Sequence, residues 1–450
     1  MSETIVLKKG LDVPVSGRAD LRVSKSMTPE VVAVLPDSAK GLLPRLLVKE
    51  GDRVLCGSPV IADKKNPDIL LTSPVSGSVK EVVRGEKRKL LAVMIKADEK
   101  QESVDFGVKD PAALSAEDVK TALLQSGLWP FLIQRPYGIL ADPAAAPKAI
   151  FASAFHSAPL AADTEFTLGS QAAFIQKGID ALAKIAPVHV SLDACVKDSA
   201  FAKLGGCTLH KFQGKHPAGN VGVQISHISP IRKGETVWTI SLSGLAAIGK
   251  LFASGRYDVR RLVAVCGPAA IEPAYVETVP GTPVKCFAPF YGNTPEEDRF
   301  ISGDILSGTN VGEDGYLLWN DDQLSIIREG TDKELLGWIR PLRLNQFSQD
   351  RSYFSWLFPC RKYDMDTNLH GGPRPFLMND AYYAKVLPMD IYPIFLAKAC
   401  YAGDIDKMEK FGIYEVLPED LALCEFVDPS KNYIQDMIAK GIDLMLKEMA

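Results

Sequence analysis

The sequence predicts a multidomain protein of mixed α/β and α+β class. Two observations lead to this class: short apolar segments separated by glycine and proline turns over the first hundred residues, and alternating strand and helix patterns after them. At 450 residues, the chain is long enough for about three domains or slightly more. We therefore expect a β-rich domain, an α/β domain, a second small β-domain and a helical domain, in that order.

The first domain, residues 1–100, is predicted to be a small β-sandwich. Its apolar bursts are split by turn residues that break strands rather than helices, namely Gly51, Gly57, Asn66, Pro67, Gly77 and Gly85. The two halves of this stretch each turn on a glycine and resemble the biotinyl/lipoyl carrier fold. In such carriers the lysine of an exposed Asp-Lys pair holds the cofactor, and Lys64 or Lys65 fits that place. The alternative is that both are ordinary solvated turn lysines.

The second domain, residues 101–258, is predicted to be a Rossmann-like α/β layer. Ser115 begins a capping-box pattern and Gly127 ends the helix that follows. Apolar strands are expected at residues 148–155, 188–192 and 207–211, with a helix at 171–185 between the first two. Strands that alternate with helices favour a parallel sheet.

Two further domains are expected in the rest of the chain. Residues 259–330 contain strand, turn and strand around a Pro-Gly-Thr turn, which predicts a small β-domain. Residues 331–450 predict a helical domain, with a helix that begins at Pro388 and a final helix over residues 430–449.

Composition excludes several classes of function. The net charge of −4 gives no basic field for nucleic acid, and no apolar run reaches the roughly 20 residues that cross a bilayer. No secretory signal is visible at the amino terminus, and none of the eight cysteines forms a Cys-x-x-Cys pair. Free thiols in a reducing cytoplasm are expected. The spacings of His210, His216 and His227 match no metal motif, so no metal is predicted.

Five short segments, in register, carry a family resemblance. They are Lys8–Asp12, Glu50–Asp52, Asp63–Pro67, Pro74–Gly77 and Arg84–Arg88. Together they resemble the A subunit of the bacterial Na⁺-translocating NADH:quinone reductase. That protein is related to the flavoprotein subunit of respiratory complex I. The relation implies that residues 259–330 form a β-grasp domain of the soluble-ligand-binding (SLBB) type, whose ligand the sequence does not reveal.

One difference between this sequence and the complex I relative bears on whether the chain binds FMN. There, the Ser-Gly-Leu end of a helix leads into a glycine-rich loop, whose bare backbone cradles the phosphate of FMN. Here the same tripeptide, at 126–128, is followed by Trp129, Pro130 and Phe131. Rings and proline cannot cradle a phosphate in that way. We therefore expect no FMN on this chain, and no iron–sulfur cluster, because the closely spaced cysteines are also missing.

The segment of large side chains from Trp129 to Tyr137 has two interpretations. Trp129, Phe131, Arg135 and Tyr137 could line an apolar groove for a quinone or a partner protein. The alternative, which we favour from sequence, is a packed helix-to-strand connection, because buried aromatic residues are most often structural.

The resemblance implies a peripheral component of a Na⁺-exporting translocase on the cytoplasmic side of the bacterial inner membrane. NADH, flavins, iron–sulfur centres and quinone would then be handled by partner subunits, including integral membrane flavin-bearing ones. This chain would supply a scaffold and quinone access, without catalytic residues of its own. Two alternatives stay open: a carrier protein modified at Lys64 or Lys65, and an Rnf-type electron-transport subunit.

Overall fold

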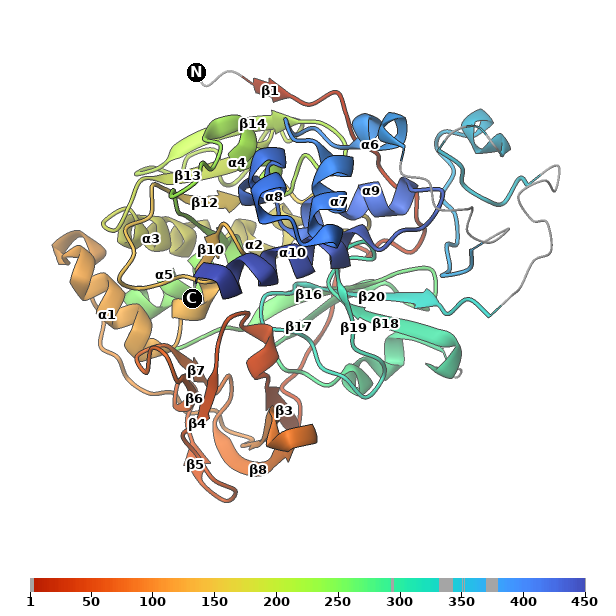
Figure 1. Cartoon of the computed structure of the whole chain (residues 1–450). Helices are drawn as coiled ribbons and strands as arrows, with labels where there is room; N and C mark the ends of the chain where they lie inside the picture. The colour runs from red at the N-terminus through yellow and green to blue at the C-terminus, as the bar shows by residue number, and fades with distance from the viewer. Residues whose placement is uncertain are drawn as a thin grey trace.

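The computed structural model describes residues 4–292, 295–331, 343–349, 351, 353–369 and 379–449. Over these residues the chain forms four β-sheets, of seven, six, four and three strands. Figure 1 shows the N-terminal β-domain below the larger α/β layer, with the C-terminal helices crossing in front of that layer.

The N-terminal domain is made of two small sheets that face each other. The four-stranded sheet has the order β3-β9-β8-β5, and the three-stranded sheet has the order β4-β6-β7. Their bounds are β3 Val31–Val34, β4 Pro44–Leu46, β5 Arg53–Val54, β6 Pro59–Asp63, β7 Leu70–Thr72, β8 Gly77–Arg84 and β9 Leu90–Ala97. Val32, Val60 and Val93 are completely buried between the sheets. The predicted pattern of short strands with an apolar inner face is confirmed.

The α/β domain is built on the seven-stranded sheet, in the order β1-β14-β13-β12-β15-β10-β11. The bounds are β1 Thr4–Val6, β10 Ile133–Arg135, β11 Ile139–Leu140, β12 Ile150–Ser153, β13 Val188–Asp193, β14 Thr208–Gln213 and β15 Val237–Ser241. The pairs from β1 to β15 are parallel, whereas β10 and β11 add antiparallel pairs at one edge. The expected strands at 148–155, 188–192 and 207–211 are all present.

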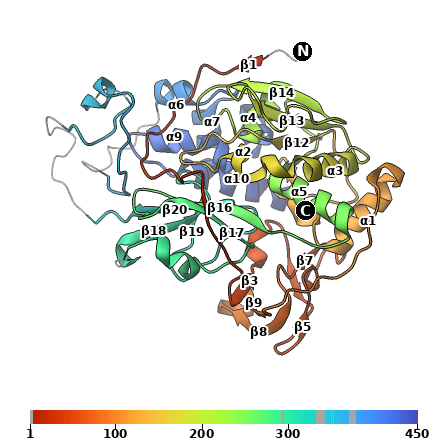
Figure 2. The ribbon, with the colours of Figure 1, turned by 180° about the vertical axis from the view of Figure 1, so that it is seen from behind.

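Helices cover this sheet, as seen from behind in Figure 2. They are α1 Ala116–Ser126, α2 Thr164–Leu168, α3 Ala172–Leu182, α4 Val221–Ile228 and α5 Leu242–Ser254. The predicted capping box of α1 is confirmed, because Ser115 and Asp118 bond reciprocally and Gly127 ends the helix in the left-handed conformation. Helices α3 and α5 approach closely: a Cβ on Gly249 would lie 1.7 Å from the carbonyl oxygen of Phe174.

The third domain holds the six-stranded sheet, in the order β19-β18-β20-β16-β17-β2. The bounds are β2 Val23–Ser26, β16 Arg261–Cys266, β17 Ala274–Thr278, β18 Asp298–Ser302, β19 Thr309–Asn310 and β20 Gln323–Arg328. Strand β2 comes from the N-terminal segment and pairs in parallel with β17, while β1 from the same segment pairs with β14. The first thirty residues therefore connect two sheets that are formed mainly by residues much later in the sequence.

Five helices follow among the described C-terminal residues: α6 Asp380–Val386, α7 Pro393–Ala402, α8 Ile405–Phe411, α9 Ala422–Val427 and α10 Ile434–Met449. The buried stripe of α10 includes Ile438, Ile442 and Met445, as its periodicity predicted. The prediction that Pro388 opens a helix is wrong. Helix α7 begins instead at Pro393, whose missing N–H suits a first turn equally well.

Candidate functional site

The segment that follows Gly127 is buried and packed. Trp129 is completely buried, its indole N–H donates a 2.8 Å hydrogen bond to the carbonyl of Ala141, and its ring meets Trp238 edge-on at 5.4 Å. A Cβ on Gly127 would lie 2.2 Å from the Thr72 methyl carbon of the N-terminal domain. Side chains thus occupy the space beside this turn, and the arrangement does not fit the open glycine cradle that an FMN phosphate needs.

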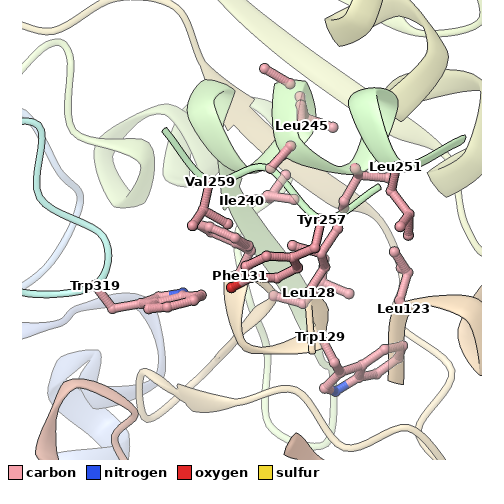
Figure 3. Packing of buried hydrophobic residues seen from close by; sticks show 14 of the residues in the cluster. Leu123, Leu128, Trp129, Phe131, Ile240, Leu245, Leu251, Tyr257, Val259 and Trp319 are labelled. Atoms are coloured by element: carbon pink, nitrogen blue, oxygen red, sulfur yellow. The ribbon is translucent and has the colours of Figure 1, made fainter. Parts of the chain in front are cut away.

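Phe131 lies two residues further, in a contact between domains. Its ring is 5.3 Å from that of Trp319 and 5.9 Å from the guanidinium carbon of Arg261, which belongs to β16. Figure 3 shows Phe131 among Val259, Tyr257 and Trp319. The ring also borders a surface cavity next to α5. This cavity is lined by Phe131 and not by Trp129, Arg135 or Tyr137.

Arg135 forms a buried ion pair with the C-terminal helical region. Its side chain is 2% exposed, and its two terminal nitrogens lie 2.9 Å from a carboxylate oxygen of Asp420 and 2.8 Å from one of Glu419. Burial disfavours the guanidinium charge, but the two carboxylates more than compensate, so the pKa of Arg135 is raised. Desolvation at this junction also raises the pKa of Glu419, although its side chain is 38% exposed. This charge pair joins β10 to a segment 285 residues later.

Two neighbours leave no spare room around this ion pair. A Cβ on Gly222, in the first turn of α4, would lie 2.3 Å from both Arg135 Nη1 and Asp420 Oδ2. Asn220 donates a 3.2 Å hydrogen bond to the carbonyl of Glu419. The glycine at position 222 is thus required by close approach, because any side chain would push the pair apart.

Tyr137 belongs to a different cluster from Trp129 and Phe131. Its ring packs edge-on against Tyr414 at 6.3 Å, within the core of the C-terminal helices. Trp129 and Phe131 instead share the core of the N-terminal and α/β domains. The structure therefore brings Arg135 and Tyr137 to the C-terminal helices and leaves the two other residues on the N-terminal side. A single groove lined by all four stays a prediction.

The charged cluster around Arg261 has no signal in the sequence. Arg261 is 5% exposed, and Asp321 and Asp322 follow Trp319 nearby in the same domain junction. Burial raises the pKa of Asp321 to about 6, although the hydroxyl of Ser302 donates to its carboxylate. Only the close packing of β16 against the loop before β20 reveals this cluster, because its two parts are far apart in the chain.

The other candidates from the sequence lie at separate places. Lys64 and Lys65 are exposed in the turn between β6 and β7, which the buried Asp63 holds by accepting hydrogen bonds from the backbone of Leu43 and Asn66. His210 pairs with His189 at 2.9 Å, whereas His216 is buried beside Ser157. In the part of the chain that the structure describes, no three histidine, cysteine or acidic side chains are grouped as a metal site.

Comparison with known proteins follows the same division of the chain. Family models match at residues 5–98 (NqrA N-terminal barrel-sandwich hybrid domain), 114–257 (NqrA second alpha/beta domain) and 262–313 (NQRA C-terminal domain, an SLBB model). These matches define the class: a multidomain protein with barrel-sandwich, α/β and SLBB domains in one chain. They confirm those three parts of the predicted fold.

Curated relatives are similar over nearly the whole length. The A subunit of the Na⁺-translocating NADH-quinone reductase from Serratia proteamaculans is 37% identical over 95% of this chain and 96% of its own. The relative of the same name from Rhodopirellula baltica is 34% identical over 98% of both chains. The chain belongs to the NqrA family, the A subunits of the Na⁺-translocating NADH-quinone reductases. The family predicted from five short segments is confirmed.

One solved structure also matches in part. A chain of an NAD⁺-reducing [NiFe]-hydrogenase has a TM-score of 0.31 and 14% identity, covering 48% of this chain and 50% of that chain. At that score the likeness defines neither fold nor function. Among the helices that the structure describes, none has both the length and the apolar composition to cross a bilayer.

The ion pair of Arg135 yields a stability prediction. In D420A the guanidinium stays buried with one carboxylate removed, so we expect the free energy of unfolding to fall by about 3–5 kcal/mol. The E419A change should cost less, because the Glu419 side chain is 38% exposed. The double change R135M/D420L replaces both charges by apolar groups and should recover most of the loss. Urea unfolding measures the stability of all three variants. If D420A lowers the free energy of unfolding by as much in an R135M background as in the unchanged chain, Arg135 and Asp420 are not coupled and the prediction is wrong.

The raised pKa of Asp321 predicts a pH dependence of stability. A carboxyl whose pKa is raised by folding binds its proton more tightly in the folded chain, so its stabilising contribution is present below about pH 4 and is lost as pH rises toward about 6. The loss is at most about 3 kcal/mol, the equivalent of that change in pKa. In D321N this decline should disappear from urea unfolding compared at pH 4 and pH 7.5. D37N, at an exposed pair with Lys89, should retain it.

Proposed function

We propose that this chain is a cofactor-free scaffold subunit of a Na⁺-translocating NADH-quinone reductase, held peripherally on the cytoplasmic side of the inner membrane. The observation that carries the proposal is the similarity to the NqrA relatives over nearly their full length. The match covers 96% of the Serratia proteamaculans chain and 98% of the Rhodopirellula baltica chain. Their shared name describes an enzyme that moves Na⁺ and passes electrons from NADH to quinone.

The scaffold role rests on the packing of the domains. Strands β1 and β2 of the N-terminal segment join two sheets of later domains, and buried charges join β10 to the C-terminal helices. An assembly whose domains are joined in this way suits a subunit that positions others. The flavins and iron–sulfur centres then belong to partner subunits, including integral membrane flavin-bearing ones, because Trp129 fills the turn where the complex I relative holds its FMN phosphate.

A quinone-access role is supported by the position of Phe131. Phe131 borders a cavity that also has polar and cationic lining, whereas Trp129 and Arg135 are enclosed. An aromatic ring beside hydrogen-bond donors is suited to a quinone head group, which is flat and carries two carbonyl acceptors.

The two alternative functions are not favoured by the comparisons, since the relatives described above are NqrA chains rather than carrier proteins or Rnf-type subunits. A carrier would also show a covalent mass gain at Lys64 or Lys65. An intact mass equal to that of the 49.0 kDa chain would remove this alternative.

Co-purification tests the scaffold assignment. A tagged chain, expressed with its neighbours, should leave detergent-solubilised membranes in fixed ratio with integral membrane subunits whose flavin is visible by absorption. The same chain purified alone, mixed with FMN and dialysed, should show no flavin band, with a known flavoprotein as the positive control. A chain that leaves membranes alone would contradict the complex assignment, and one that retains FMN would contradict the cofactor-free role.

Photolabelling tests quinone access separately. With an azido-quinone bound to the whole complex, we expect label in the peptide that contains Phe131, and less label after F131A, which removes the ring. Excess unlabelled quinone should compete for the same peptide. The matched control is F174A, at a partly exposed phenylalanine of α3 outside the cavity lining. Label confined to partner subunits would overturn this part of the proposal.

A further inference from the structure

A short segment of the C-terminal region exposes several large apolar side chains next to one another. It contains the 3-10 helix η9, Phe354–Leu357. Four of the five residues from 354 to 358 are large and apolar, and each is between 38% and 50% exposed: Phe354, Trp356, Leu357 and Phe358. Together they leave roughly 350 Å² of side-chain surface in water. In both ribbon views this part of the chain stands out from the side of the molecule (Figure 1, Figure 2).

The base of this segment is fixed to the body of the chain. Ser355 is the buried residue of η9, and its hydroxyl accepts from the N–H of Ser348 at 3.1 Å and donates to the carbonyl of Ser348 at 3.2 Å. Tyr363 is 4% exposed, and its backbone bonds to Pro14 at 2.8 Å and to Ser16 at 3.0 Å in the N-terminal segment. The apolar side chains therefore point outward from an anchored base.

Positive charges surround the exposed apolar residues. Residues 351–362 contain Arg351, Arg361 and Lys362, all of them exposed, and no carboxylate. The guanidinium carbon of Arg351 lies 5.2 Å from the ring centre of Trp356. None of the three cations forms an ion pair with another described residue. The acidic residues of the neighbouring sequence lie outside this range, at Asp350, Asp364 and Asp366. The range thus carries three positive charges on a chain whose net charge is −4.

This combination matches a lipid surface better than a protein surface. Tryptophan and other aromatic rings are favoured at the headgroup level of a bilayer, and lysine and arginine beside them attract anionic headgroups. A stable contact between proteins buries about 800 Å² on each partner, and the four side chains offer roughly half of that. Apolar side chains that enter the boundary between headgroups and acyl chains need no matching groove.

We propose that residues 351–362 form a lipid-contact tip, which inserts Trp356, Leu357 and Phe358 into the interfacial layer of an anionic bilayer. Arg361 and Lys362 bind the headgroup phosphates where the tip returns to the body of the chain. The inference rests on the peripheral placement proposed above and adds that this chain contacts lipid directly. Because the chain as a whole is acidic, a basic tip also orients it on a negatively charged surface.

Co-sedimentation of the full chain with vesicles tests the inference without partner subunits. We expect binding to vesicles of phosphatidylglycerol and phosphatidylethanolamine, and much weaker binding to phosphatidylcholine alone. The double change W356A/F358A should lower the partition coefficient by about tenfold or more, because it removes two rings from the tip. The matched control is Y392A/F395A, which removes two exposed rings at the start of α7 and should leave binding unchanged.

The cations are tested by a second pair of variants. R361Q/K362Q should weaken binding to the anionic vesicles by roughly tenfold, and added salt should reduce the difference. K87Q/R88Q removes the same charge from two exposed neighbours in the N-terminal domain and should bind as the unchanged chain does. Loss of binding in the control variants but not in the tip variants would overturn the inference.

Tryptophan quenching locates the tip in the bilayer. Among the described residues, Trp129, Trp238 and Trp319 are buried, whereas Trp356 is exposed. Brominated acyl chains should therefore quench fluorescence in the unchanged chain and much less in W356F, which keeps an aromatic ring and should still bind. Quenching that W356F leaves unchanged would overturn the inference.

Two further outcomes would also overturn it. One is no binding to the anionic vesicles at all. The other is a chain that ignores vesicles but has Cys360, exposed in the tip, protected from alkylation within the purified complex, because the tip is then a protein contact. Neither result changes whether the chain co-purifies with flavin-bearing membrane subunits, so this inference and the proposed function fail separately.

Discussion

The buried pair of Arg135 with Asp420 is the constraint on which the arrangement of the domains depends. A guanidinium that is 2% exposed cannot be left without a counter-charge, so the C-terminal helices must dock where Asp420 reaches β10. Gly222 permits this approach, because any side chain at that position would displace both charges. One charge pair and one glycine therefore specify where the helical region docks. Apolar packing around Tyr137 and Tyr414 supplies the remaining contacts.

The N-terminal segment imposes a second constraint of a different kind. Its strands β1 and β2 extend two sheets by backbone hydrogen bonds, to β14 and β17. Backbone pairing gives little sequence specificity, but it covers an exposed edge of each sheet. The β-sandwich that follows then packs against α1 through β7, so that Thr72 closes the turn at Gly127. The result is that the turn at Gly127 is an interior contact between two domains.

Local features of the fold could be predicted from sequence, and distant ones could not. The capping box at Ser115 and the strand at residues 188–192 depend on neighbours within a few positions, so their patterns were sufficient. The helix start predicted at Pro388 was wrong because proline suits any first turn, and Pro393, where the helix begins, follows shortly after it. The charge pair of Arg135 spans 285 residues, and no periodic pattern records such a contact. For the same reason the four candidate site residues could be recognised as bulky and buried, but not assigned to separate cores.

Arg135 and Arg261 show two outcomes of the same physical problem. Both are buried cations at domain junctions, and both have an Nε without a partner. Arg135 has two carboxylates within 3 Å, so its charge is satisfied inside the chain and the surrounding space is filled. Arg261 has a 3.5 Å contact to the backbone carbonyl of Asp321, and Asp322 and Asp321 offset its burial only in part, so its pKa is lowered. Carboxylates at hydrogen-bond distance raise the pKa of Arg135, whereas the more distant carboxylates around Arg261 do not overcome the desolvation of its guanidinium.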